Sequence, residues 1–297
     1  MADITLLDGG LGQELVARSG KAPTPLWSTS VMMENPGIVH GLHKDYFAAG
    51  ATVATTNTYG LHHDRLVKFD IDDQFAALNM QALAEAASAR AEHGTGRIAG
   101  SLGPLRASYR PELFPPHEEA VASYAELAAL LAPAVDFFIA ETVASLAHAR
   151  AVLEGAAVGG RPVWLSVTVD DEDGGRLRSG EAVADLAPIV AGKAAAILAN
   201  CSAPEAMAAA LDIFRSFGLP FGAYANGFQE ITKDFLKDNP TVASLSARPE
   251  MTPALYADFA LKWVGMGATI IGGCCETTPA HIAEIAQRLM AAGHRIV

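Results

Sequence analysis

The sequence contains few cysteines and lacks several patterns that define broad classes of protein. Its three cysteines are an odd number, and two of them are adjacent, at Cys274 and Cys275, which argues against a framework of disulfides. No run of about 18 uninterrupted apolar residues is present, so we predict no membrane-spanning helix. The first residues do not combine a basic run with an apolar stretch, so we predict no secretory signal. We therefore expect a cytoplasmic protein whose thiols are kept reduced.

Blocks of positive charge are also missing. The chain has 21 Lys and Arg against 33 Asp and Glu, a formal net charge of −12, and no run of basic residues. Because binding to nucleic acid needs clustered positive charge, we expect a small-molecule partner instead. A hydrophobic content of 51% with 18% charged residues predicts a large core. No linker or low-complexity run divides the chain, so we predict one domain over residues 1–297.

Eight short apolar segments recur along the chain, and most precede a longer stretch with helical periodicity, such as the one in which Ile38, Leu42 and Tyr46 share a face. Several segments are apolar at consecutive positions, which is typical of strands buried on both faces. Repeated strand and helix units of this kind predict an α/β fold, a (β/α)₈ TIM barrel, with an open doubly wound sheet as the alternative. The predicted strands are residues 4–7, 51–56, 97–101, 135–140, 162–169, 194–199, 221–225 and 268–271.

Polar residues and glycines gather directly after these predicted strands. In a barrel the carboxyl ends of the strands form one face, and barrel enzymes place their sites there. All three cysteines of the chain follow predicted strands and therefore belong to this face. The groups in question are Asp8-Gly9-Gly10, Asn57-Thr58-Tyr59-Gly60, Gly103-Pro104, Glu141-Thr142, Asn200-Cys201-Ser202, Asn226-Gly227 and Gly272-Gly273-Cys274-Cys275.

Cys201, Cys274 and Cys275 form a candidate metal site. Three thiolates can hold one tetrahedral Zn²⁺ and leave a fourth position open, which is the pattern of catalytic zinc. A site made only of sulfur also favours Zn²⁺ over hard cations. The alternative interpretation is that these cysteines are small buried hydrophobic residues, since free cysteine is among the most buried residue types.

These motifs resemble those of a known family. Asp8-Gly9-Gly10, Asn200-Cys201-Ser202 and Gly272-Gly273-Cys274-Cys275, followed by Thr277-Thr278-Pro279 and His281-Ile282, are similar to the homocysteine S-methyltransferase family. That family includes enzymes that use S-methylmethionine or betaine as methyl donor, and the homocysteine-binding module of methionine synthase. The resemblance extends over nearly the whole chain, and the cysteine pattern is its most specific part.

The resemblance implies a barrel in which the three cysteines hold Zn²⁺ and the homocysteine sulfur becomes the fourth ligand. A free thiol has a pKa near 8.5, whereas a metal-bound thiol is deprotonated, so the metal makes the sulfur a nucleophile. The expected reaction transfers a methyl group from a small, positively charged donor to homocysteine and forms methionine. The expected partners are homocysteine and this donor, and the oligomeric state is left open.

Further site residues follow from the same resemblance. The backbone amides of Gly9 and Gly10 would bind the carboxylate of homocysteine, while Glu141 and Asp8 would receive its ammonium group. Asn226 matches a position that completes the zinc shell in relatives when the substrate is absent. From the residues alone, each also has a simpler interpretation: the glycines form a turn, Glu141 caps a helix, and Asn226 is a turn residue.

The identity of the donor rests on aromatic residues. Trp27 and Tyr59 match two walls of the donor cage in the betaine enzyme, but Thr142 stands where that enzyme has a tyrosine. Aromatic faces attract soft cations, and a smaller sulfonium needs fewer walls than a quaternary ammonium, so S-methylmethionine is the expected donor. The alternatives are betaine, or a methylated corrinoid carried by a separate protein. The simpler interpretation is that Trp27 and Tyr59 pack under a loop.

Two other classes of function remain as alternatives to a zinc methyltransferase. The first is a metal-independent barrel lyase or hydrolase that uses Asp8 and Glu141 as an acid and base pair. The second is a zinc or redox sensor in which the three cysteines respond to oxidation. The adjacent His62 and His63 stand in a polar stretch of the predicted rim, where we expect solvated side chains and assign no role.

Overall fold

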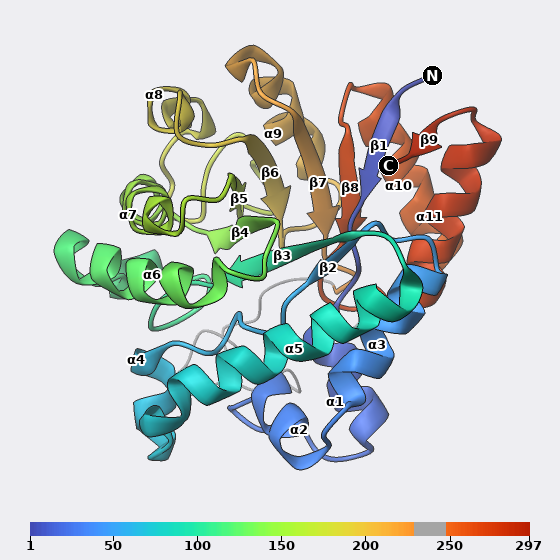
Figure 1. The fold of residues 1–297 in the computed structure, drawn as a ribbon. Helices are drawn as coiled ribbons and strands as arrows, with labels where there is room; N and C mark the ends of the chain where they lie inside the picture. Colours follow the sequence, from blue (N-terminus) through green and yellow to red (C-terminus); the bar gives the residue numbers. More distant parts are fainter. Residues whose placement is uncertain (229–247) are drawn as a thin grey trace.

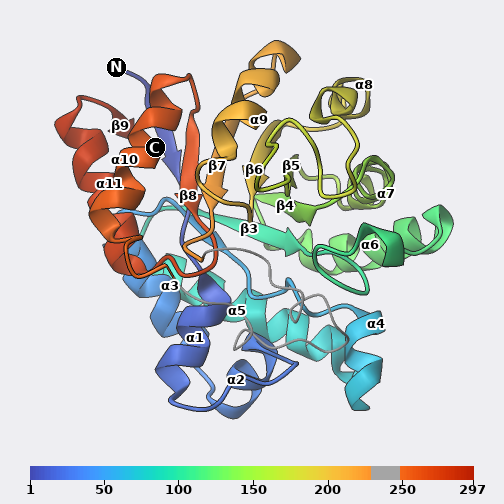
Figure 2. The same ribbon diagram turned by 180° about the vertical axis from the view of Figure 1, so that it is seen from behind.

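Eight parallel strands surround a common axis in this computed structural model, which describes residues 1–228 and 248–297. Each predicted strand segment overlaps one of them, with bounds that differ by up to three residues. The helices cover the outside of the sheet on all sides, as the two opposite views in Figures 1 and 2 show. The strands are β1 (Asp3–Leu6), β2 (Val53–Thr55), β3 (Arg97–Leu102), β4 (Phe137–Val143), β5 (Val163–Val167), β6 (Ala196–Asn200), β7 (Phe221–Ala225) and β8 (Ile270–Gly273).

The strands follow the order β2-β3-β4-β5-β6-β7-β8-β1, and each neighbouring pair forms a parallel ladder. The ring closes between β1 and β2, where the Thr52 N–H donates to the Leu6 carbonyl at 2.7 Å. The Thr55 N–H also donates to the carboxylate of Asp8 at 2.7 Å. The prediction of a (β/α)₈ barrel is therefore confirmed, and the open doubly wound sheet is not formed.

Alternate residues of the strands fill two separate layers of the core, because successive side chains of a strand point to opposite faces. Phe137, Ile139 and Trp164 belong to the cluster inside the barrel. Phe138 and Leu165 belong to the larger cluster between the strands and the helices. Burial of both layers explains why these strands are apolar at consecutive positions.

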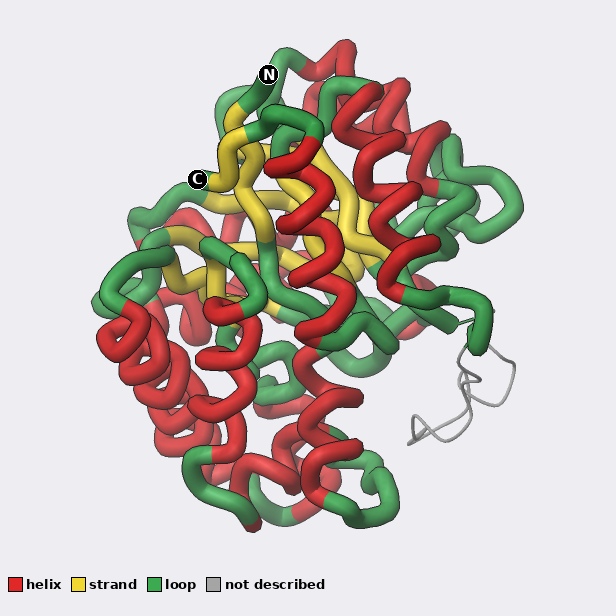
Figure 3. The backbone as a smooth tube through the Cα atoms, turned by 90° about the vertical axis from the view of Figure 1, so that its right-hand side faces the viewer, coloured by secondary structure: helices red, strands yellow, loops and turns green. Residues whose placement is uncertain are grey.

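The barrel is surrounded by helices that alternate with the strands (Figure 3). Several begin at the signals that the sequence carries: Thr252 caps α10, and Thr278 caps α11 together with His281, with proline at the first helical position in both cases. In the described part of the chain the helices are α1 (Leu11–Ser19), α2 (Ser28–Glu34), α3 (Ile38–Ala48), α4 (His63–Leu66), α5 (Phe75–His93), α6 (His117–Leu131), α7 (Leu146–Ala156), α8 (Ala187–Val190), α9 (Met207–Phe214), α10 (Pro253–Gly265) and α11 (Pro279–Ala291). None of these helices has the length and apolar character needed to cross a membrane.

A short ninth strand, β9 (Arg295–Ile296), pairs with the beginning of β1. The hydroxyl of Thr52, the residue before β2, donates at 2.8 Å to the carbonyl of Val297, the residue after β9. Both chain termini lie at the amino end of the barrel, away from the arrowheads of the strands in Figure 1. The sheet thus runs without interruption from β2 to β9.

Candidate active site

The three cysteines meet at the carboxyl ends of β6 and β8. Their Sγ atoms all lie within 4.8 Å of one another. Cys201 and Cys274 are joined as a disulfide, and Cys275 is the free thiol. This pairing differs from the three free thiols that we expect from the sequence. The strand ends bring the sulfur atoms so close together that two of them can bond to each other instead of to a shared ion.

The loop that carries Cys274 and Cys275 is held to the first βα turn. Gln13 exchanges two hydrogen bonds with Glu276, both at 2.8 Å, one to its side chain and one from its backbone N–H. A Cβ atom at Gly10 would lie 2.5 Å from the carbonyl oxygen of Cys274, so only glycine allows this approach. The Gly10 N–H donates to the carbonyl of Thr277 at 2.8 Å. Gly10 therefore already uses its amide to fix the cysteine loop.

Glu141 enters the same pocket through an irregularity in β4. The pairing of β4 with β5 shifts register between Ala140 and Val143, which indicates a bulge at Glu141 and Thr142. Bulges of this kind redirect side chains and occur often beside active sites. Ser101 donates to one carboxylate oxygen of Glu141 at 2.6 Å, and Tyr224 donates to the other at 3.0 Å. Burial raises the pKa of Glu141 above its ordinary value, and these two hydrogen bonds oppose the rise.

Asp8 is buried beside the closure of the barrel. Thr55 donates to both of its carboxylate oxygens, through the backbone N–H at 2.7 Å and the hydroxyl at 2.8 Å. Burial nevertheless raises the pKa of Asp8 to about 7, and the negative charge of Glu141 adds to this effect. Two carboxylates with raised pKa values in one pocket favour a cationic group such as an ammonium, which would stabilise both charges.

Asn200, which directly precedes Cys201, fixes the backbone at Thr142, the residue after Glu141. Its side-chain oxygen accepts from the Thr142 N–H at 3.0 Å and from the Ser166 hydroxyl at 2.9 Å. Its amide group donates to the Thr142 hydroxyl at 3.2 Å. Both Thr142 and Cys201 have positive φ angles, 57° and 51°, which non-glycine residues adopt only under constraint. The hydrogen bonds of Asn200 supply that constraint at Thr142.

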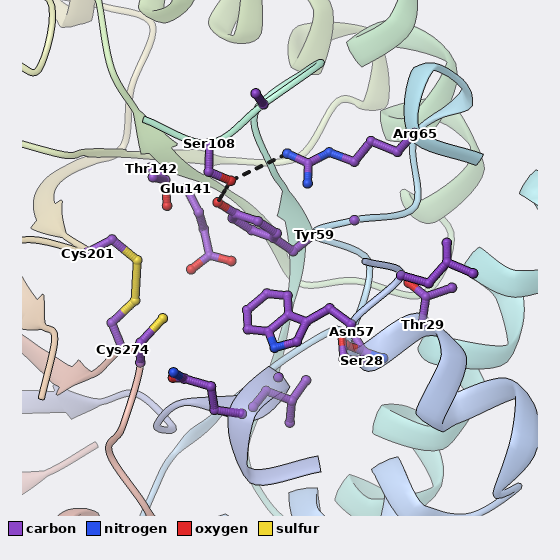
Figure 4. A pocket seen from close by; sticks show the side chains of 18 of the residues that line it. Ser28, Thr29, Asn57, Tyr59, Arg65, Ser108, Glu141, Thr142, Cys201 and Cys274 are labelled. Carbon is purple, nitrogen blue, oxygen red and sulfur yellow. Dashed lines mark hydrogen bonds between the residues drawn. A yellow bond between two sulfur atoms is a disulfide. The ribbon is translucent and has the colours of Figure 1, made fainter. Parts of the chain in front are cut away.

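Aromatic residues form the wall opposite the cysteines. The rings of Trp27 and Tyr59 pack edge to face, with centroids 6.1 Å apart at an angle of 78°. A Cβ atom at Gly12 would lie 2.4 Å from the Trp27 ring, so this glycine makes room for the indole. The hydroxyl of Tyr59 forms a hydrogen bond with Ser108 at 2.7 Å. Figure 4 shows Glu141 between Tyr59 and the pair formed by Cys201 and Cys274.

One pocket of about 550 Å³ joins these groups. Within the described residues, seven non-glycine positions have positive φ; five of them line this pocket, and a sixth, Glu276, directly follows Cys275. Concentrated backbone strain of this kind is typical of functional sites. The structure thus brings nine of the ten predicted site residues into one pocket: Asp8, Gly9, Gly10, Trp27, Tyr59, Glu141, Cys201, Cys274 and Cys275.

The tenth predicted residue, Asn226, is buried next to the cysteines. Its neighbour Gly227 donates its N–H to the carbonyl of Cys275 at 2.7 Å. Neither polar atom of the Asn226 side chain has a hydrogen-bond partner in the described part of the chain. A buried amide without a partner is costly and marks a place where a ligand atom or ion fits.

Sequence reasoning did not identify the residues that hold the two carboxylates, namely Thr55, Ser101 and Tyr224, nor the role of Asn200 in holding Thr142. They stand inside or at the ends of strands, where their polar character in otherwise apolar segments is the available signal. All four belong to strands that come together only in the barrel: β2, β3, β6 and β7. Their partners are distant in sequence, since Ser101 lies 40 residues and Tyr224 lies 83 residues from Glu141.

The fold and the site together define a TIM-barrel enzyme with a cluster of three cysteines and an acidic pair at the carboxyl ends of its strands. The model of the family described as Homocysteine S-methyltransferase matches residues 5–289. The Homocysteine S-methyltransferase of Escherichia coli (strain K12) is 31% identical over 308 residues, which cover 96% of this chain and 95% of that protein. The chain therefore belongs to the homocysteine S-methyltransferase family, and its reaction is the transfer of a methyl group to homocysteine.

Solved structures agree with this assignment. The metallated form of the homocysteine methyltransferase MmuM from Escherichia coli has a TM-score of 0.80 and 29% identity, with 96% of each chain covered. Its oxidized form has a TM-score of 0.81 and 30% identity, with the same coverage. The relative has thus been observed in both a metallated and an oxidized state.

Proposed function

We propose that this enzyme holds Zn²⁺ on Cys201, Cys274 and Cys275 and methylates the thiol of homocysteine with a small sulfonium donor such as S-methylmethionine, forming methionine. The observation that carries the proposal is the approach of three Sγ atoms to within 4.8 Å at the base of the pocket. Three protein sulfurs match a catalytic zinc site, which keeps one position for the substrate. The unpartnered side chain of Asn226 beside Cys275 supports a further ligand in the substrate-free state.

The chemistry of the cysteines fits a metal. Burial, with the negative charges of Glu276 and Glu141, raises the pKa of the Cys275 thiol to about 12. Zn²⁺ supplies positive charge that favours thiolates and, when bound, lowers the pKa of a substrate thiol as well. Cys201 and Cys274 can act as ligands only when they are reduced, because a disulfide has no thiolate. A reducing compartment supports this state, in line with the expected cytoplasmic location.

The acidic pair and the first βα turn would bind the amino-acid part of homocysteine. We infer that Glu141 and Asp8 receive the ammonium group, since both line the pocket and the neighbourhood of a cation would favour their charged forms. Gly9 and Gly10 stand directly before α1, whose amino terminus attracts a carboxylate. The Gly10 amide already donates to Thr277. The Gly9 amide, which forms no hydrogen bond within the described residues, is therefore the stronger candidate for this contact.

The donor would lie against Trp27 and Tyr59. Their rings provide two aromatic walls, while Thr142 offers a small polar side chain where the betaine enzyme has a third ring. Two walls suit the compact sulfonium of S-methylmethionine better than the larger ammonium of betaine. Transfer needs the methyl carbon in line between donor and acceptor sulfur, so the rings act mainly by orienting the donor.

Other interpretations lose support. Membership in the family argues against a metal-independent lyase or hydrolase. In a homocysteine methyltransferase we expect the acidic pair to bind the substrate and not to act as acid and base catalysts. Membership in this family of enzymes also argues against a sensor without enzymatic activity. Betaine and a methylated corrinoid protein remain as alternative donors within the same reaction.

A panel of donors tests the proposal. Reduced, zinc-loaded protein is incubated with homocysteine and with S-methylmethionine, betaine or a methylated corrinoid protein, and methionine is measured. We expect about one zinc per chain by elemental analysis, and at equal concentrations S-methylmethionine should outpace betaine by more than about tenfold, which needs only about 1.4 kcal/mol. Efficient turnover with betaine, or only with the corrinoid protein, would reject the sulfonium donor. Absence of zinc after reconstitution would reject the metal site.

A further inference from the structure

Arg65 on α4 reaches into the pocket from the side away from the cysteines (Figure 4). One terminal nitrogen of its guanidinium donates to the carbonyl of Pro104 at 2.8 Å and lies 3.5 Å from the hydroxyl of Ser108. The guanidinium carbon lies 5.6 Å from the centroid of the Tyr59 ring. Ser108 in turn holds the hydroxyl of Tyr59. The guanidinium is thus fixed against the aromatic wall to which the donor is assigned.

The charge of Arg65 has no counterion within the described part of the chain. Arg106 and Arg110 line the same pocket, and each pairs with a carboxylate: Arg106 with Glu119 at 2.9 Å and Arg110 with Glu112 at 2.7 Å. Arg65 forms no such pair among the described residues, and its Nε atom is buried without a hydrogen-bond partner. The adjacent Asp64 accepts a hydrogen bond from the backbone of Arg106 instead. Arg65 therefore brings a positive charge without an ion-pair partner among the described residues to the lining of the pocket.

An uncompensated guanidinium beside Tyr59 conflicts with a donor that carries positive charge alone. Two cations in one partly buried pocket repel each other strongly, because the low local dielectric screens them poorly. The conflict disappears when the donor also carries a negative group that reaches the arginine. Carboxylates match the forked geometry of a guanidinium and form charge-assisted hydrogen bonds with it.

We propose that Arg65 binds the carboxylate of a zwitterionic methyl donor, so that the pocket selects donors in which a methylated cationic centre and a carboxylate belong to one molecule. This inference rests on the proposed function in one respect, namely that the donor is a small cation bound at Trp27 and Tyr59. Recognition of the donor's carboxylate by Arg65 would let the pocket select its methyl donor without a complete aromatic cage. A neutral or purely cationic molecule with the same sulfonium is then a poor donor.

The test compares each donor with its isosteric primary amide, which keeps the cation and loses the negative charge. S-methylmethionine and its amide, and betaine and its amide, are measured as donors by methionine formation and as ligands by calorimetry. With the unmodified enzyme we expect the acid that serves as donor to exceed its amide at least about tenfold in kcat/KM and in affinity. In Arg65→Met this preference should shrink to about twofold or less, with the amide used as well as before. Arg65→Lys should retain part of it.

Arg106→Gln is the matched control, because it removes one positive charge from the same rim where Glu119 already balances it. This variant should keep the preference for the acid within about twofold. An unchanged preference in Arg65→Met overturns the proposal, as does an equal loss with acid and amide at unchanged thermal stability. A rise in the KM for homocysteine alone would place Arg65 on the acceptor instead. Calorimetry measures binding without turnover. If the protein binds the acids selectively but forms no methionine, the proposed function is rejected while the role of Arg65 is retained.

Discussion

The two ends of the barrel differ in how their charged side chains are stabilised. At the amino end, the guanidinium of Arg97 lies over the packed rings of Phe137 and Trp164, 5.5 Å from each ring centroid, and donates to the Thr5 hydroxyl at 3.0 Å. At the carboxyl end, Asp8 and Glu141 are buried with raised pKa values. The amino end satisfies its charge inside the protein, whereas the carboxyl end keeps groups that a substrate would stabilise better than the protein does.

Backbone conformation shows the same difference. Trp27, Thr142 and Cys201 have positive φ at the carboxyl end, whereas none of the seven described non-glycine residues with positive φ stands at the beginning of a strand. Strain of this kind persists only where the surrounding structure enforces it, and it costs of the order of 1–3 kcal/mol per residue. Backbone strain is thus concentrated at the carboxyl end, where the proposed site lies, and we expect the amino end to contribute mainly to stability.

The largest expected effect is the loss of a cysteine. Cys275→Ala should remove the bound zinc and bring methylation below detection, because the remaining sulfurs cannot complete the three-ligand site. The barrel should stay folded, since the alanine leaves the strands unchanged. Metal analysis, methionine formation and thermal unfolding measure the three properties. A variant with near-normal turnover would remove Cys275 from the mechanism and weaken the contrast between the two ends.

The opposite result is expected at the amino end. Trp164→Ala deletes a large side chain of the inner core and should lower the free energy of unfolding by about 3–5 kcal/mol. The rate constant of the folded enzyme should remain close to normal, because Trp164 lies away from the pocket. Trp164→Phe is the milder control, since it retains a ring against Phe137. Loss of turnover at temperatures where Trp164→Ala is still folded would contradict the separation of stability from function.

A smaller effect is expected for Glu141, the carboxylate proposed to bind the ammonium group of the substrate. Glu141→Gln preserves shape and removes the negative charge, so affinity for homocysteine should fall by about 1.5–3 kcal/mol while the zinc content stays constant. Ser101→Ala, which removes one hydrogen bond to Glu141 but keeps its charge, should cost less. Equilibrium binding measurements give both values. Unchanged affinity in Glu141→Gln would exclude a contact between this carboxylate and the ammonium group.

The smallest effect concerns pH. Because the pKa of Asp8 is raised to about 7, binding of an ammonium requires this carboxyl group to lose its proton. Affinity for methionine, which has no thiol proton, should therefore increase about tenfold between pH 6 and 8. Calorimetry in buffers of different ionisation enthalpy should show a proton released on binding. Asp8→Asn should bind weakly with no such dependence, and an equally steep profile in this variant would assign the proton to another group.

The same shift has the opposite effect on stability. A buried acid with a raised pKa holds its proton more tightly in the folded state than in the unfolded state. The contribution of Asp8 to the free energy of unfolding is therefore present at low pH, and it decreases as the pH rises from the ordinary value of 3.8 to about 7. The carboxyl end thus gives up stability in the pH range where it gains affinity for substrate.

Much of this architecture follows from the sequence by itself. The apolar segments determine the eight strands, since burial on both faces requires apolar residues at consecutive positions. The position of Cys201, Cys274 and Cys275 after strands then places them on one face, because parallel strands of a barrel end together. Both inferences depend on neighbours in the chain, and they needed no knowledge of distant contacts.

Only the tertiary structure decided how the site is held and charged. His62, expected to be solvated, is buried and packs edge-on against Tyr124 with ring centroids 5.8 Å apart. Glu141, expected after a strand, lies inside β4 at a bulge whose backbone Asn200 holds from 58 residues away. The unbalanced charge of Arg65 is equally invisible in the sequence, which has acidic residues nearby. These properties depend on tertiary contacts across the barrel. Such contacts cannot be predicted from the local sequence, because the residues involved are neighbours only in the folded chain.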